Sequence, residues 1–247
     1  MKSISFYSSM GMMLAILVCS SVAVSQNSAF HPDRKVEMIV EKPSSKAIES
    51  LQILKEGNKR FLSGASTHER QDPERIKDLA KGQNPKCVIV GCSDSRVPPE
   101  IVFDQGLGDV FSIRTAGNVM ADFEIGSIEY AIDHLHTPLV VVMGHQGCGA
   151  IKALLDHVDN VDAGNASERE DHVSKIIEKL KSEEEEQEVL RTAGKNFNLA
   201  VVANVVHGVK QLRNSDPHLK KAYLNGEINI VGAIYHIESG EVEFLDF

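Results

Sequence analysis

The fold is decided by the stretch Leu139-Val140-Val141-Val142-Met143-Gly144-His145-Gln146-Gly147-Cys148-Gly149. Its five apolar residues run without polar alternation, which is typical of a strand buried on both faces of a sheet. A glycine-rich turn follows and leads into the helix-forming residues 150–155. Two side chains that can bind metals, His145 and Cys148, lie in that turn. The stretch therefore predicts a buried strand, a turn carrying chemistry and a helix.

Three further apolar runs, at residues 87–90, 110–113 and 228–234, resemble the first. Helix-like stretches separate them, and strands that alternate with helices form parallel sheets. Residues 241–247 alternate in polarity after Ser239-Gly240, so we expect an antiparallel edge strand. The sequence predicts an α/β fold: a central parallel β-sheet of about four strands with an antiparallel edge strand, flanked by helices and preceded by an N-terminal helical arm at residues 26–82.

Composition excludes several classes of protein. The chain has 247 residues with 26 Lys and Arg against 35 Asp and Glu, a formal charge of -9 that argues against a nucleic-acid partner. Four cysteines are too few for a disulfide framework. The acidic run at residues 183–186 is expected to be the solvated face of a helix.

The first 25 residues are typical of an export signal. Lys2 precedes the short apolar run of residues 10–18, and small residues follow up to Ser25. We therefore expect a signal peptide at residues 1–25, a single catalytic domain at residues 26–247 and a periplasmic location in a bacterium, with no membrane attachment after signal removal. The cleavage site and lipidation at Cys19 stay open. The mature chain would keep three thiols, an odd number that favours metal binding over pairing.

A second turn carrying chemistry follows the first apolar run, at Gly91-Cys92-Ser93-Asp94-Ser95-Arg96. Carboxyl ends of parallel strands share one edge of a sheet, where ligands bind. If this segment stays extended, Cys92, Asp94 and Arg96 project to the same side. We expect them to meet the His145 turn there.

Two thiolates and one imidazole suit Zn²⁺, and a site with three protein ligands leaves a fourth position open for catalysis. Zinc-bound water loses its proton near neutral pH, for which carbonic anhydrase is the standard example. Asp94, held by Arg96, could accept the proton of the resulting hydroxide and orient its oxygen. Cys87 lies on the opposite strand face from Cys92 and is expected in the core.

Three other functions compete with zinc-hydroxide chemistry of this kind. A nucleotide-binding loop would explain the glycines, but their order is G-x-x-G-x-G and no Gly-Lys-Ser/Thr follows. A non-catalytic zinc or thiol redox sensor would leave Asp94 and Arg96 without a role. A zinc-dependent hydrolase shares the chemistry but usually needs a general acid for its leaving group. The hydrolase and the sensor stay as alternatives.

The two turns together resemble the β-class carbonic anhydrases. The resemblance extends from about Gly82 to Leu155 and includes the segments at residues 103–106 and 114–118. It implies one zinc ion per chain on Cys92, His145 and Cys148, a catalytic Asp94-Arg96 pair, and reversible hydration of CO₂ to bicarbonate and a proton. It also implies a homodimer or a dimer of dimers, with active sites at subunit boundaries.

Further residues resemble the plant-like, type I branch of that family. Gln83, Phe111 and Tyr130 match its substrate pocket, where these side chains come from the partner subunit. Gly149 matches a backbone donor to bicarbonate. The allosteric branch uses a Trp, which this chain lacks, so the open, water-ligated form is expected. Without the resemblance, Phe111 and Tyr130 would be assigned to the core and Gln83 to a solvated turn. Ala116 is smaller than its plant-type counterpart.

Overall fold

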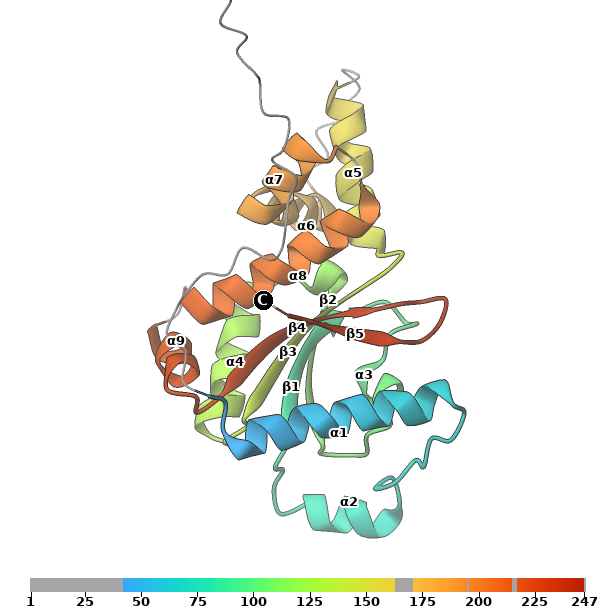
Figure 1. Cartoon of the computed structure of the whole chain (residues 1–247), viewed down its shortest axis with the longest axis vertical. Coiled ribbons are helices and arrows are strands. Elements are labelled where there is room, and N and C mark those ends of the chain that lie inside the picture. Colours follow the sequence, from blue (N-terminus) through green and yellow to red (C-terminus); the bar gives the residue numbers. More distant parts are fainter. Residues whose placement is uncertain (1–41, 163–170, 195, 215–216, 247) are drawn as a thin grey trace, which may run out of the picture.

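The computed structural model describes residues 42–162, 171–194, 196–214 and 217–246. Its centre is a five-stranded sheet in the order β2-β1-β3-β4-β5 (Figure 1). Four strands are parallel and the last is antiparallel: β1 (Cys87–Cys92), β2 (Val110–Thr115), β3 (Leu139–His145), β4 (Asn229–Tyr235) and β5 (Val242–Leu245). The predicted fold class is confirmed. Residues 1–41, which hold the predicted signal peptide and the start of the arm, lie outside the described residues.

Helices flank the sheet, and Figure 1 shows α1 and α8 on opposite sides of it. They are α1 (Ser45–Leu62), α2 (Pro73–Leu79), α3 (Pro99–Val102), the 3₁₀ turn η1 (Ala116–Asn118), α4 (Asp122–Asp133), α5 (Gly149–Asp162), α6 (His172–Lys181), α7 (Glu184–Thr192), α8 (Phe197–Asn214) and α9 (Pro217–Leu224). The described part of the arm holds two helices, α1 and α2, with the non-helical residues 63–72 between them. Of the described helices, none combines the length and the apolar character that crossing a membrane requires.

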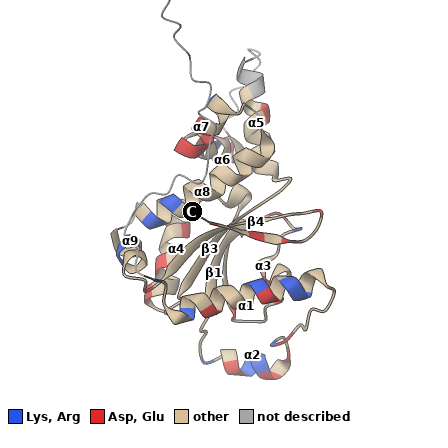
Figure 2. Cartoon of the chain, in the orientation of Figure 1, with Lys and Arg blue, Asp and Glu red and all other residues tan. Residues whose placement is uncertain are grey.

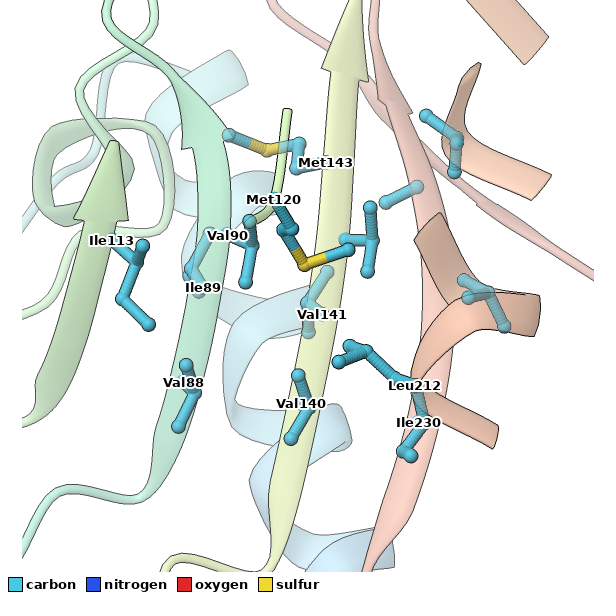
Figure 3. Close-up of a cluster of buried hydrophobic side chains, with 14 of the residues drawn as sticks. Val88, Ile89, Val90, Ile113, Met120, Val140, Val141, Met143, Leu212 and Ile230 are labelled. Atoms are coloured by element: carbon cyan, nitrogen blue, oxygen red, sulfur yellow. The ribbon is translucent and has the colours of Figure 1, made fainter. Parts of the chain in front are cut away.

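The core is built on the strands that the apolar runs predict. Every residue of β1 and β3 is buried, and Figure 3 shows side chains such as Val88, Val90, Val140 and Val141 packed between neighbouring elements. Cys87 belongs to this core, as expected. Each fully buried aliphatic side chain contributes roughly 1.5–3 kcal/mol of transfer free energy. This rigid centre fixes the strand ends that carry the polar turns.

The register brings those ends together. Gly91 of β1 lies beside Met143 of β3, so Cys92 is level with Gly144, one residue before His145. On the other side of β1, Cys92 lies beside Thr115 at the end of β2. The two predicted turns therefore leave the sheet side by side.

The prediction of a solvated face at residues 183–186 is wrong for three of its four residues. Glu183, Glu185 and Glu186 are buried. They lie at the start of α7, which packs against α8 (Figures 1 and 2). Glu185 accepts bonds from Lys210 at 2.6 Å and from His207 at 2.7 Å, both on α8. Lys210 and His207 lie on a second helix, which local charge patterning does not reveal, and their bonds explain the burial of Glu185.

Candidate metal centre

Three potential metal ligands converge where β1 and β3 end. The donor atoms of Cys92, His145 and Cys148 all lie within 4.8 Å of one another, and all three residues are buried. Zinc bonds of about 2.3 Å to sulfur and about 2.0 Å to nitrogen would let one ion reach this set. Among the described residues, this is the only group of three or more His, Cys, Asp and Glu residues placed to share a metal ion. The predicted ligand set is brought together.

The imidazole of His145 is oriented for this role. Its Nδ1 lies 2.8 Å from the carbonyl oxygen of Gln146. Because a carbonyl only accepts hydrogen bonds, Nδ1 carries the proton, and Nε2 keeps its lone pair. Nε2 is buried and has no hydrogen-bond partner. A buried nitrogen without a partner is costly unless something binds it, and a metal ion between the two sulfurs would satisfy it.

The two thiols differ in their environment. The pKa of Cys92 is lowered to about 4, mainly because the Cys148 thiol bonds to its sulfur, against the opposing effect of burial. The same contact and burial raise the pKa of Cys148. Cys148 also precedes α5, and its carbonyl accepts the Lys152 amide at 3.0 Å. The positive end of α5 favours a negative charge on the Cys148 sulfur. Because metal ions bind thiolates, a bound metal would displace the proton of the Cys148 thiol and leave both cysteines ionised.

Asp94 and Arg96 form the expected pair, but by a different route. β1 ends at Cys92, and residues 95–96 form a turn rather than a continued strand. The Arg96 backbone N–H donates to Asp94 Oδ1 at 2.9 Å, as in an Asx turn. The guanidinium adds bonds of 2.9 Å to Oδ1 and 2.7 Å to Oδ2, and these contacts hold the pKa of Asp94 well below its usual range. The segment therefore does not stay extended, because the carboxylate closes a turn with the residue two positions later.

The pair borders the metal ligands without joining them. Asp94 Oδ2 lies 4.0 Å from His145 Nε2, and Arg96 also donates to the Gly147 carbonyl at 3.1 Å. Arg96 thus bridges the turns after β1 and β3. If the three ligands held a metal ion, Asp94 would lie beside it as a hydrogen-bond acceptor, fixed by its bonds to Arg96.

Three residues that support the cluster had no assigned role in the sequence analysis. Arg114 of β2 donates to the carbonyls of Cys92 at 2.9 Å and Asp94 at 2.6 Å. The Gly117 N–H donates to Cys92 Sγ at 3.3 Å, and Asn204 of α8 donates to the Gly117 carbonyl at 2.8 Å. Arg114 and Gly117 lie in a segment of the resemblance. Asn204 is a polar residue inside the apolar stretch at residues 199–206, a signal that could have identified it.

The four predicted substrate residues do not all meet at this cluster within one chain. Gly149 follows Cys148 directly and begins α5. Phe111 and Tyr130 pack together, with ring centroids 6.3 Å apart. However, Phe111 lies beside Val88, four residues before the end of β2 and thus about 13 Å from it along the strand. Gln83 lies before β1, in a surface cavity of about 500 Å³ at the opposite end of that strand.

Comparison with known proteins points the same way as the geometry. The family model described as "Carbonic anhydrase" matches residues 87–242. The carbonic anhydrase of Mycolicibacterium smegmatis is 38% identical over 206 residues, which cover 81% of this chain and 94% of that protein. Carbonic anhydrase 2 of Mycobacterium tuberculosis is 48% identical over 118 residues, covering 48% of this chain and 57% of that protein.

Solved structures extend the likeness to the fold. The β-carbonic anhydrase CcaA superposes with a TM-score of 0.61 at 29% identity, covering 79% of this chain and 95% of that one. A tetrameric β-carbonic anhydrase of Sordaria macrospora gives a TM-score of 0.58 at 24% identity, covering 81% and 98%. The matched region contains both turns and all three clustered metal ligands. This chain belongs to the β-class carbonic anhydrase family.

Proposed function

We propose that this protein catalyses the reversible hydration of CO₂ to bicarbonate and a proton, with one zinc ion held by Cys92, His145 and Cys148. The observation that carries the proposal is the buried, unpartnered His145 Nε2 within 4.8 Å of two thiols, next to a carboxylate that Arg96 holds. Zinc in such a site supplies an acidified water as nucleophile, for which carbonic anhydrase is the standard example.

Asp94 has an orienting role in this proposal. Two guanidinium bonds and one backbone bond keep the carboxylate ionised and fixed, so it can only accept a hydrogen bond. A hydrogen-bond acceptor in a fixed place would hold the attacking oxygen in the orientation that the reaction needs, instead of leaving it free to rotate. CO₂ hydration has no leaving group, so no general acid is required of the chain.

The plant-like branch is the form that these residues favour. Three protein donors surround the metal position, and Arg96 retains the carboxylate that could otherwise become the fourth. Gly149 is the first residue of α5, where N–H groups lack partners within the helix and favour anions such as bicarbonate. We assign Asp94 and Arg96 the catalytic role and Gly149 a substrate-binding role.

Gln83, Phe111 and Tyr130 would complete the pocket from the partner subunit of a homodimer. Their placement away from the cluster of their own chain supports this assignment. Phe111 lies on β2, an edge strand of the sheet, and Tyr130 is half exposed beside it. An edge strand beside an exposed aromatic side chain is a suitable surface for a second copy. In a dimer of dimers, each of the two dimers would form through this same contact.

We also propose that the protein is exported. Residues 1–25 would act as a signal peptide and residues 26–247 as one catalytic domain that works in the bacterial periplasm. The charged start, short apolar run and small residues of the first segment support this proposal.

The function is tested by metal analysis and stopped-flow CO₂ hydration on the same purified protein. We expect about one zinc per chain and rapid hydration. The variant Cys148→Ala should lose both zinc and hydration. Zinc without hydration would refute the proposal and favour the hydrolase or the sensor, and activity in a zinc-free protein would refute the metal site.

A further inference from the structure

The zinc ligand Cys92 is supported by a chain of contacts that begins on a distant helix. Asn204 lies in the middle of α8 and is only 3% exposed. Its Nδ2 donates to the Gly117 carbonyl at 2.8 Å and also lies 3.3 Å from Asn118 Oδ1. Because both partners are acceptors, the amide nitrogen must face η1. One buried side chain therefore holds two successive residues of that turn.

Gly117 passes this constraint to the metal ligand. Its N–H donates to Cys92 Sγ at 3.3 Å. Gly117 has a positive φ of 69°, and a Cβ there would lie 2.8 Å from the Cβ of Ala150. The turn is therefore confined between the sulfur on one side and the start of α5 on the other. Hydrogen bonds to a metal-bound sulfur, and the groups that fix them, control ligand position and metal affinity.

Helix α8, which carries Asn204, also packs against β3, the strand that ends in the ligand His145. A Cβ on Gly144, the residue before His145, would lie 2.6 Å from Val205 Cγ2 and 3.3 Å from Val201 Cγ1. Val205 is the neighbour of Asn204 on α8. Helix α8 thus touches the carboxyl end of β3 directly at Gly144 and reaches that of β1 through Gly117 of η1.

We infer that Asn204 is a positioning residue for the zinc site, acting through the Gly117 peptide on the Cys92 sulfur. The inference rests on the proposed zinc site and adds a residue to its support. It gives α8 a specific function, namely to hold η1 against Cys92, in addition to covering the sheet.

The test compares two buried asparagines in the full protein. Asn204→Leu removes the amide and keeps a side chain that branches at the same atom. Asn58→Leu is the matched control, because Asn58 is equally buried and bonds to the carbonyls of Val102 and Gly240 and to the Val242 N–H. Those partners lie outside the ligand cluster. Both variants should lose thermal stability, whereas only Asn204→Leu should alter the metal site.

Two readouts other than activity report on that site. The first is the rate at which zinc passes to a chromophoric chelator, and the second is the thiolate-to-metal absorption band of the cobalt-loaded protein. We expect Asn204→Leu to weaken zinc retention by about 10–100-fold and to shift the cobalt band. Asn58→Leu should match the wild type in both. If Asn204→Leu does not fold, Asn204→Ala is measured in the same way.

Wild-type zinc retention and an unchanged cobalt band in the Asn204 variant would overturn the inference. Equal changes in the Asn58 variant would also overturn it, because they would show a general loss of stability. A wild-type protein that retains no zinc would refute the proposed function itself, and this inference with it.

Discussion

Arg96 is a residue whose loss should affect catalysis without removing a metal ligand. It holds Asp94 with two guanidinium bonds and reaches the Gly147 carbonyl, yet it contributes no donor atom to the metal cluster. Loss of Arg96 would free the carboxylate to take the open metal position. A side chain that is itself exposed can therefore decide whether the site stays open.

We predict that Arg96→Ala retains zinc but loses hydration activity by at least about 100-fold, because Asp94 is no longer held as a hydrogen-bond acceptor. Zinc content and stopped-flow rates are measured on the same sample. Lys152→Ala is the control, since Lys152 is an exposed cation four residues after Cys148 that pairs with Asp156. Unchanged turnover in the Arg96 variant would refute the role of the pair.

Helix α7 carries a buried acid with an unusual titration. Glu186 is 0% exposed, and neither of its carboxylate oxygens has a hydrogen-bond partner. Burial, together with the nearby Glu183 and Glu185, raises the pKa of Glu186 to about 9 from an ordinary value of 4.5. The unfolded chain therefore releases this proton at a much lower pH than the folded chain, and stability falls as the pH rises between those two values.

We predict that Glu186→Gln stabilises the fold more at pH 8.5 than at pH 5. Well below pH 4.5, the wild-type carboxyl is neutral in both the folded and the unfolded state, and the variant gains little. At pH 8.5 the gain in unfolding free energy should exceed about 1.4 kcal/mol, the equivalent of one pKa unit. Thermal or urea unfolding at both pH values measures it.

Glu184→Gln provides the comparison, because Glu184 is exposed on the same helix and its substitution removes the same charge. Equal gains in the two variants, or a Glu186 gain that does not grow with pH, would contradict this account of α7.

Helix α4 has an exposed aromatic face that could contact a second copy of the chain. Phe123 is 88% exposed and Tyr130 is 50% exposed. Residues seven apart on a helix share one face. Tyr130 also packs on Phe111 of the edge strand β2. In the proposed dimer this face meets the partner and completes its pocket.

We predict that Phe123→Asp weakens the dimer at least about 10-fold and lowers hydration activity in parallel, because each site would lose the partner's pocket residues. Sedimentation equilibrium and stopped-flow assays at matched concentrations measure both effects. Val173→Asp places the same charge on an exposed apolar residue of α6 and should change neither. A Phe123 variant that stays dimeric and fully active would contradict the proposed interface.

Across the whole molecule, sequence patterns predict the buried strands and the metal ligands but not the contacts that depend on how helices pack. Unbroken apolar runs identify β1 and β3 because burial on both faces leaves no room for polar residues, and the ligands follow because strand ends share an edge. The Asp94 turn was not predicted, since a side chain competing for its own backbone breaks the strand period. The burial of Glu186 and the contact of Asn204 depend on how α8 packs, which local pattern does not encode.

The central claim is that two sulfurs and one imidazole bind a single zinc ion and leave one position to solvent. A crystal structure at neutral pH with anomalous data at the zinc edge tests it most directly. We expect one peak per chain between Cys92, His145 and Cys148, with Asp94 still paired to Arg96. A peak elsewhere, or Asp94 bound as a fourth protein ligand, would contradict the account.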